Sequence, residues 1–131
     1  MPTRVKMVFD HKYHGMLTGH HGAAPVGPEE GALSPYDMVL GGLGACLNHT
    51  FQTILDKKRL TFESVNYAIE GVKRKTVPTM LETVTLSITL SGVEKDKEAP
   101  FRNAMELAAK HCSVYATISA VADITWTLDF K

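Results

Sequence analysis

The chain has 131 residues, the usual size of one domain, and we expect a single domain over residues 1–131. Hydrophobic residues make up 44% of the chain and charged residues 21%, close to the averages of globular proteins. This composition excludes a disordered tail, a collagen-like repeat and a fibrous chain. Fourteen basic and 14 acidic residues cancel, so no overall charge draws the chain to nucleic acid or to an anionic membrane.

The sequence shows no sign of export or of membrane insertion. Residues 1–9 contain no apolar run of the length found in a secretory signal. The most apolar stretch, residues 38–47, includes three glycines and is about half as long as a membrane span. We therefore expect a cytoplasmic protein without a membrane partner. In that reducing compartment a disulfide between its two cysteines, Cys46 and Cys112, would more often be catalytic or redox-sensing than structural.

Alternating apolar and polar residues predict several strands. Glycine, histidine and proline dominate residues 11–31, which favours short strands and turns over a helix there. Between Pro100 and Cys112, apolar residues recur at helical spacing and predict a helix. The two long alternating segments, residues 64–72 and 81–91, are expected to pair antiparallel, with one face of the sheet exposed. The predicted strands cover residues 4–9, 64–72, 81–91 and 123–130.

The longest predicted helix begins after Ser34, a favourable N-cap, and continues to the basic residues 57–59. Pro35 suits its first position, and Asp37 suits a capping acid in its first turn. Its apolar residues cover more than one stripe, so we expect a central helix rather than a superficial one. Three glycines within residues 41–44 each cost about 1 kcal/mol relative to alanine, which predicts close approach of another backbone, such as that of a partner helix.

Residue spacing alone gives this sequence no catalytic, metal-binding or phosphate-binding motif. A single cysteine in an apolar helix is most often a small buried side chain. The six histidines form no zinc-finger or HExxH pattern and there is no CxxC, so we expect no metal and no cofactor. The glycines of residues 41–44 are not followed by the lysine and hydroxyl residue of a phosphate-binding loop.

Two segments resemble one known family. Residues 34–48, SPYDMVLGGLGACLN, resemble the signature helix of the OsmC/Ohr family of osmotically induced and organic hydroperoxide resistance proteins. Residues 108–114, AAKHCSV, are similar to the family's second cysteine segment, with Ser113 in place of the usual proline. The resemblance implies an α+β, OsmC-like fold in which antiparallel sheets wrap around central cysteine-bearing helices in an intertwined homodimer.

The same resemblance implies a thiol-dependent peroxidase. Cys46 would be the peroxidatic thiol and Cys112 the resolving thiol. A thiolate attacks the O–O bond of hydrogen peroxide or an organic hydroperoxide and becomes a sulfenic acid, which the second thiol converts to a disulfide. An external dithiol then reduces that disulfide.

The chain departs from the family pattern where the thiolate is activated. Tyr36 stands where peroxidases of the family have a glutamate that positions an arginine, and there is no arginine between residues 5 and 58. Asp37 is one residue away and suits a cap, whereas His49 lies three residues after Cys46 on the same side of the predicted helix. The Cys46 thiolate therefore lacks an obvious stabilising group, and we expect its pKa to be nearer to that of a free thiol than the pKa of a dedicated peroxidase is. The alternative function is a non-enzymatic dimer that senses redox state or binds a small molecule.

Overall fold

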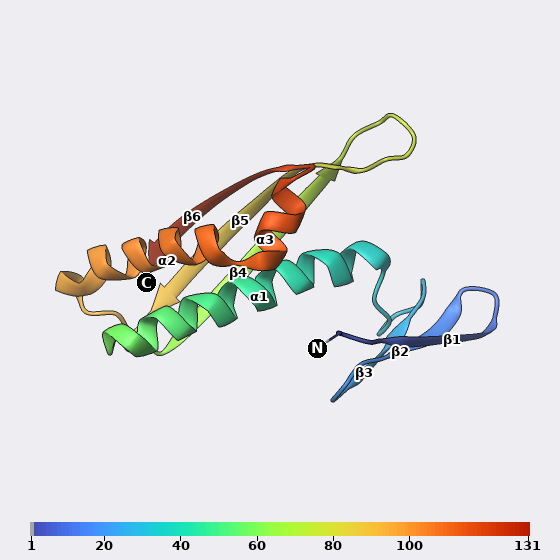
Figure 1. Ribbon diagram of the computed structural model, residues 1–131, viewed down its shortest axis with the longest axis horizontal. Helices are drawn as coiled ribbons and strands as arrows, with labels where there is room; N and C mark the ends of the chain where they lie inside the picture. Colours follow the sequence, from blue (N-terminus) through green and yellow to red (C-terminus); the bar gives the residue numbers. More distant parts are fainter. Residues whose placement is uncertain (1) are drawn as a thin grey trace. The chain divides into compact units, whose positions relative to one another are not determined.

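The computed structural model describes residues 2–131, except for the side chain of residue 11. The chain divides into two compact units, one ending at Val39 and one running from Leu40 to Lys131. No helix in the described part of the chain is long and apolar enough to cross a membrane. The elements, labelled in Figure 1, are β1 (Lys6–His11), β2 (His14–Thr18), β3 (Ala23–Val26), α1 (Pro35–Lys58), β4 (Ser64–Lys73), β5 (Leu81–Ser91), a 3-10 turn (Lys95–Lys97), α2 (Glu98–His111), α3 (Ser113–Ser119) and β6 (Asp123–Phe130).

The first unit is a three-stranded antiparallel sheet in the order β1-β2-β3. β1 overlaps the strand predicted at residues 4–9, and β2 and β3 are short strands within residues 11–31, as predicted. Several large apolar side chains of this sheet are exposed to solvent in the single chain. They are Met7, Val8, Phe9 and Met16.

The second unit contains a sheet in the order β4-β5-β6. β4 and β5 pair antiparallel, as predicted, from the Ser64–Ser91 pair to the Lys73–Leu81 pair. β6 runs parallel to β5, so the expectation of purely antiparallel sheets is wrong for this pair. The connection between them passes through α2 and α3, and a crossover of this length returns the chain to the end of the sheet from which β5 started.

The core of the second unit lies between its helices and one face of its sheet. Figure 1 shows α1 and α2 side by side on the same face. The rings of Phe51 in α1 and Phe101 in α2 meet at 6.4 Å between centroids, edge to face. Every second residue of β5 from Val84 onward is fully buried. The buried residues of α1 and β5 include Leu43, Leu47, Phe51, Leu55, Val84, Leu86, Ile88 and Leu90.

The start of α1 follows its predicted cap. The Ser34 amide donates to Asp37 Oδ2 at 2.8 Å, and the Asp37 amide donates to Ser34 Oγ at 3.1 Å. Two amide groups at the helix start are thereby satisfied. α2 is also confirmed, whereas α3 was not predicted because it has only seven residues and is rich in β-branched side chains.

The glycines of α1 differ in their surroundings. A Cβ at Gly44 would lie 2.8 Å from Cδ1 of Ile69 in β4, so the close approach predicted here is that of a side chain rather than of a backbone. Gly41 and Gly42 are exposed, and a Cβ at either would meet no described atom within 4 Å. Within one chain, the fully buried residues of α1 form a single stripe with a spacing of four, and the face that carries Gly41 and Gly42 remains uncovered.

Candidate functional site

Cys46 lies in the middle of α1, within the second unit, and its side chain is half-buried. The flanking Leu43 and Leu47 are fully buried and fix the rotation of the helix against the core. Gly44 brings this part of α1 close to Ile69 of β4. The Cys46 thiol is therefore held at the edge of the core, partly open to solvent.

Cys112 lies at the junction of α2 and α3. Its amide donates to the Ala108 carbonyl at 2.9 Å and ends α2, and its own extended backbone separates the two helices. Its sulfur accepts a hydrogen bond from the Tyr115 amide at 3.4 Å, so the thiol serves as the N-cap of α3. Only 1% of this residue is exposed. The second cysteine is thus fixed by backbone contacts on both sides.

The fold brings the two predicted thiols together. Both cysteines are free. The Cys112 thiol is one of the groups that affect the pKa of Cys46, and Cys46 in turn affects the pKa of Cys112. Cys46 Sγ also lies 3.9 Å from Ser113 Oγ. Because the residues that face the Cys46 sulfur follow one another from Cys112 to Val114, the start of α3 forms one wall of the site.

The surroundings of the two sulfurs differ in their effect on ionisation. A hydrogen bond from the Val114 amide, then one from the Cys112 thiol, and then those from Ser113 lower the pKa of the Cys46 thiol against the opposing effect of burial. Burial raises the pKa of Cys112, and the neighbouring Cys46 sulfur adds to that rise. The pair therefore carries its first negative charge on Cys46 while Cys112 keeps its proton. The expectation that Cys46 lacks a stabilising group is wrong.

Tyr67 of β4 and Asn48 of α1 adjoin the thiol pair. The Tyr67 hydroxyl donates to Asn48 Oδ1 at 3.0 Å. Burial, followed by the charge at Cys112, raises the pKa of Tyr67, so this phenol stays neutral when the thiols ionise. The hydrogen bond ties the segment of α1 after Cys46 to the sheet.

The predicted auxiliary residues are His49, Tyr36 and Asp37. The exposed side chain of His49 makes no hydrogen bond to Cys46 in the part of the chain that the structure describes, and its assistance stays a prediction. Tyr36 and Asp37 lie in the first turn of α1, within the first unit, where Asp37 caps the helix. Among the described residues, no three histidine, cysteine, aspartate or glutamate side chains are placed to hold a metal ion.

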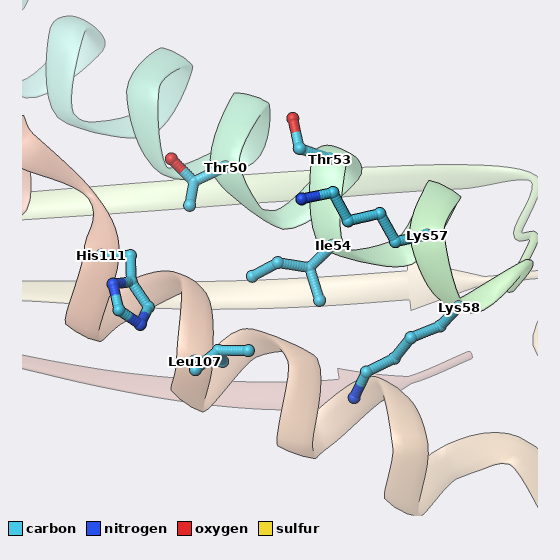
Figure 2. Close-up of a pocket in the computed structure, with 7 residues that line it drawn as sticks. All are labelled: Thr50, Thr53, Ile54, Lys57, Lys58, Leu107 and His111. Carbon is cyan, nitrogen blue, oxygen red and sulfur yellow. The ribbon is translucent and has the colours of Figure 1, made fainter.

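A groove of about 420 Å³ runs between α1 and α2, and neither cysteine is among its lining residues. It begins at Thr50, one helical turn after Cys46, whose carbonyl accepts the Thr50 hydroxyl at 3.1 Å. Figure 2 shows Ile54 and Leu107 reaching toward each other across the groove from the two helices. The groove combines this apolar floor with two ammonium groups at the end of α1. Its lining residues are Thr50, Thr53, Ile54, Lys57, Lys58, Leu107 and His111.

Sequence reasoning missed Ser113, Val114, Tyr67 and Asn48 as members of the site. Ser113 and Val114 reach Cys46 because α3 begins directly after Cys112, and the sequence carried no familiar cap for that helix. The alternation along residues 64–72 places Tyr67 on the apolar face of its strand but gives no sign of its hydrogen bond.

The fold and the site define an α+β protein with a half-buried thiol on one helix and a buried thiol at the junction of two others. The chain belongs to the family of OsmC-like proteins, whose family model matches residues 27–127. A search of curated proteins finds no match.

Solved structures share the fold across nearly the whole chain. A hypothetical protein from Aquifex aeolicus VF5 is 22% identical with a TM-score of 0.82, covering 100% of this chain and 98% of its own. An OsmC-like protein from Mycoplasma pneumoniae is 16% identical with a TM-score of 0.80, covering 98% and 97%. An organic hydroperoxide resistance protein OsmC from Legionella pneumophila is 17% identical with a TM-score of 0.73, also covering 98% and 97%.

Proposed function

We propose that this protein reduces organic hydroperoxides with Cys46 as the attacking thiolate and Cys112 as the resolving thiol. The observation that carries this function is the placement of Cys112 directly before Ser113, whose Oγ lies 3.9 Å from Cys46 Sγ, together with pKa values of the two free thiols that are shifted in opposite directions. One sulfur is prepared to attack, and the other stays protonated until it is needed. The names of structural relatives such as the Legionella protein agree with hydroperoxides as the substrate class.

The chemistry balances in three steps. The Cys46 thiolate attacks the terminal oxygen of the hydroperoxide, the O–O bond breaks, and the products are a sulfenic acid and an alkoxide that takes up a proton to become the alcohol. The Cys112 thiol attacks the Cys46 sulfur, a disulfide forms, and the hydroxyl leaves as water. An external dithiol then exchanges with the disulfide and returns both cysteines to thiols.

The groove between α1 and α2 favours an organic hydroperoxide over hydrogen peroxide. Its floor is formed by Ile54 and Leu107, which suit the alkyl part of a substrate. Hydrogen peroxide has no alkyl part to use these contacts. We therefore expect a higher kcat/KM for cumene hydroperoxide than for hydrogen peroxide.

We further propose that the active form is a cytoplasmic homodimer in which residues 1–131 act as one OsmC-like domain. Gly41, Gly42 and Ala45 leave the central part of α1 exposed, and small residues of this kind allow a second helix to approach closely. The exposed apolar side chains of the first sheet give a second reason for a partner, because single chains rarely leave such patches open.

A peroxide-consumption assay with dithiothreitol tests the function. The reduced protein should consume cumene hydroperoxide catalytically, and Cys46→Ser should abolish turnover. Without dithiothreitol, the unmodified protein should consume about one equivalent, whereas Cys112→Ser should consume more than one, since no resolving thiol protects the sulfenic acid from further oxidation. Stoichiometric oxidation without turnover in the unmodified protein would instead favour the redox-sensing dimer.

A further inference from the structure

Among the described residues, the hydroxyl of Ser113 differs from the other hydroxyls around the site because it does not donate to a backbone carbonyl. Thr50 and Thr117 donate their hydroxyls to the carbonyl four residues earlier, and Ser119 donates to the Ala116 carbonyl. Ser113 opens α3, where no preceding helical turn offers such a carbonyl. In the described part of the chain, the hydrogen-bond partner of Ser113 Oγ is Cys46 Sγ, at 3.9 Å.

We propose that the Ser113 hydroxyl is a catalytic hydrogen-bond donor to the Cys46 thiolate, a role that rests on the hydroperoxide reduction proposed above. The hydroxyl rotates freely about its Cβ–Oγ bond and turns its hydrogen toward the sulfur when Cys46 ionises. The contact is long in the absence of substrate, and hydrogen bonds of this kind shorten as negative charge develops at the reacting atom. No proton leaves Ser113, so the three-step balance given above is unchanged.

The backbone at residue 113 also tolerates substitutions that remove the hydroxyl and amide donors of Ser113. Cys112 already has an extended backbone, with φ −74° and ψ 119°, which is the conformation required before a proline. Proline is favoured at the first position of a helix, where the amide has no intrahelical partner. Ser113→Ala therefore removes the hydroxyl, and Ser113→Pro removes both the hydroxyl and the amide hydrogen, without breaking α3.

Among the groups near the Cys46 sulfur, Ser113 is the one that the variants change. Cys112 keeps its proton because burial raises its pKa. Tyr67 of β4 and Tyr115 of α3 stay neutral because burial raises the pKa of each phenol. His49 lies on the same helix as Cys46, and its exposed ring is unchanged in every variant.

Removal of the Ser113 hydroxyl should change two quantities together, the pH midpoint of Cys46 alkylation and its limiting rate at high pH. A structural defect would not produce this combination. Loss of one hydrogen bond to a charged group should raise the pH midpoint of Cys46 alkylation by about one unit. A thiolate of higher pKa is also intrinsically more nucleophilic, by about threefold per unit, so the limiting rate at high pH should rise about threefold. At pH values well below the midpoint of the unmodified protein, the tenfold loss of thiolate and the threefold gain in reactivity leave a rate about threefold lower.

The experiment measures the rate of iodoacetamide alkylation of Cys46 against pH by peptide mass spectrometry. Ser113→Ala should show the raised midpoint and the higher limiting rate, Ser113→Pro a larger rise in the midpoint, and Ser113→Thr the unmodified midpoint. Ser119→Ala, which removes a hydroxyl from the same helix away from Cys46, should change neither quantity. An unmoved midpoint in Ser113→Ala, or a midpoint that Ser113→Thr fails to restore, would overturn the assignment.

Alkylation requires no peroxidase turnover, so the two proposals fail separately. If the midpoints move as expected but cumene hydroperoxide is not consumed, the donor role of Ser113 stands and the proposed function fails. If turnover is present and the midpoints do not move, the function stands and another group supports the thiolate.

Discussion

Replacement of Gly44 by alanine tests how closely α1 packs on β4 next to the reactive thiol. The new Cβ would lie 2.8 Å from Cδ1 of Ile69, a distance at which one of the two side chains must shift. Cδ1 is the far end of the Ile69 side chain and can move by rotation, so the cost should lie at the low end of the range of about 1–3 kcal/mol for overpacking. Alanine also has a better helix propensity than glycine, by about 1 kcal/mol. We therefore expect these two effects nearly to cancel, so that Gly44→Ala changes the free energy of unfolding by less than about 1 kcal/mol.

Ile69→Val supplies the matched control because it removes the methyl group that conflicts with the new Cβ. Alone it should cost about 0.5–1.5 kcal/mol. The double variant should be more stable than the sum of the two single changes predicts, by about 1 kcal/mol or more, since the conflict is gone. Urea unfolding of the four proteins at one protein concentration measures this coupling. Strictly additive effects would refute the close packing at Gly44.

Three further predictions follow from the site and from the proposed dimer. As the pH rises, iodoacetamide should modify Cys46 before Cys112, because the pKa of Cys46 is lowered and that of Cys112 is raised; peptide mapping that found the reverse order would contradict the assigned roles. Tyr67→Phe should lower the free energy of unfolding by about 1 kcal/mol in urea, because Asn48 Oδ1 loses its donor, and an unchanged midpoint would show that this hydrogen bond contributes nothing. Gly42→Leu fits the open space within one chain but would obstruct a partner helix, so sedimentation should show the dimer weakened, and an unaffected dimer would exclude α1 contact at this residue.

The long elements could be predicted because their local signals are strong. β5 and β6 begin and end at the predicted residues, since apolar and polar side chains alternate along their whole length. Ser34, Pro35 and Asp37 fixed the start of α1 through a cap that is encoded within four residues. These features depend on near neighbours in the chain, which is why sequence patterns carry them.

The direction of β6 and the donors to the reactive thiol depend on distant contacts. The alternation within β6 is the same whether it runs parallel or antiparallel, and the crossover through α2 and α3 decides between them. The two cysteines were paired by their resemblance to a family, but Ser113 reaches Cys46 across 67 positions of sequence. Tyr67 and Asn48 meet only when β4 packs on α1. No local sequence pattern indicates such long-range contacts.

A single-turnover oxidation shows whether Cys46 attacks the hydroperoxide and Cys112 resolves the product. The reduced protein is mixed with one equivalent of cumene hydroperoxide, the remaining thiols are blocked, and the chain is digested and mapped by mass spectrometry without reduction. We expect an intramolecular disulfide between Cys46 and Cys112, with a loss of two hydrogens per chain and one cumyl alcohol formed. An overoxidised Cys46 beside a free Cys112, or two unmodified thiols with the hydroperoxide intact, would contradict this expectation.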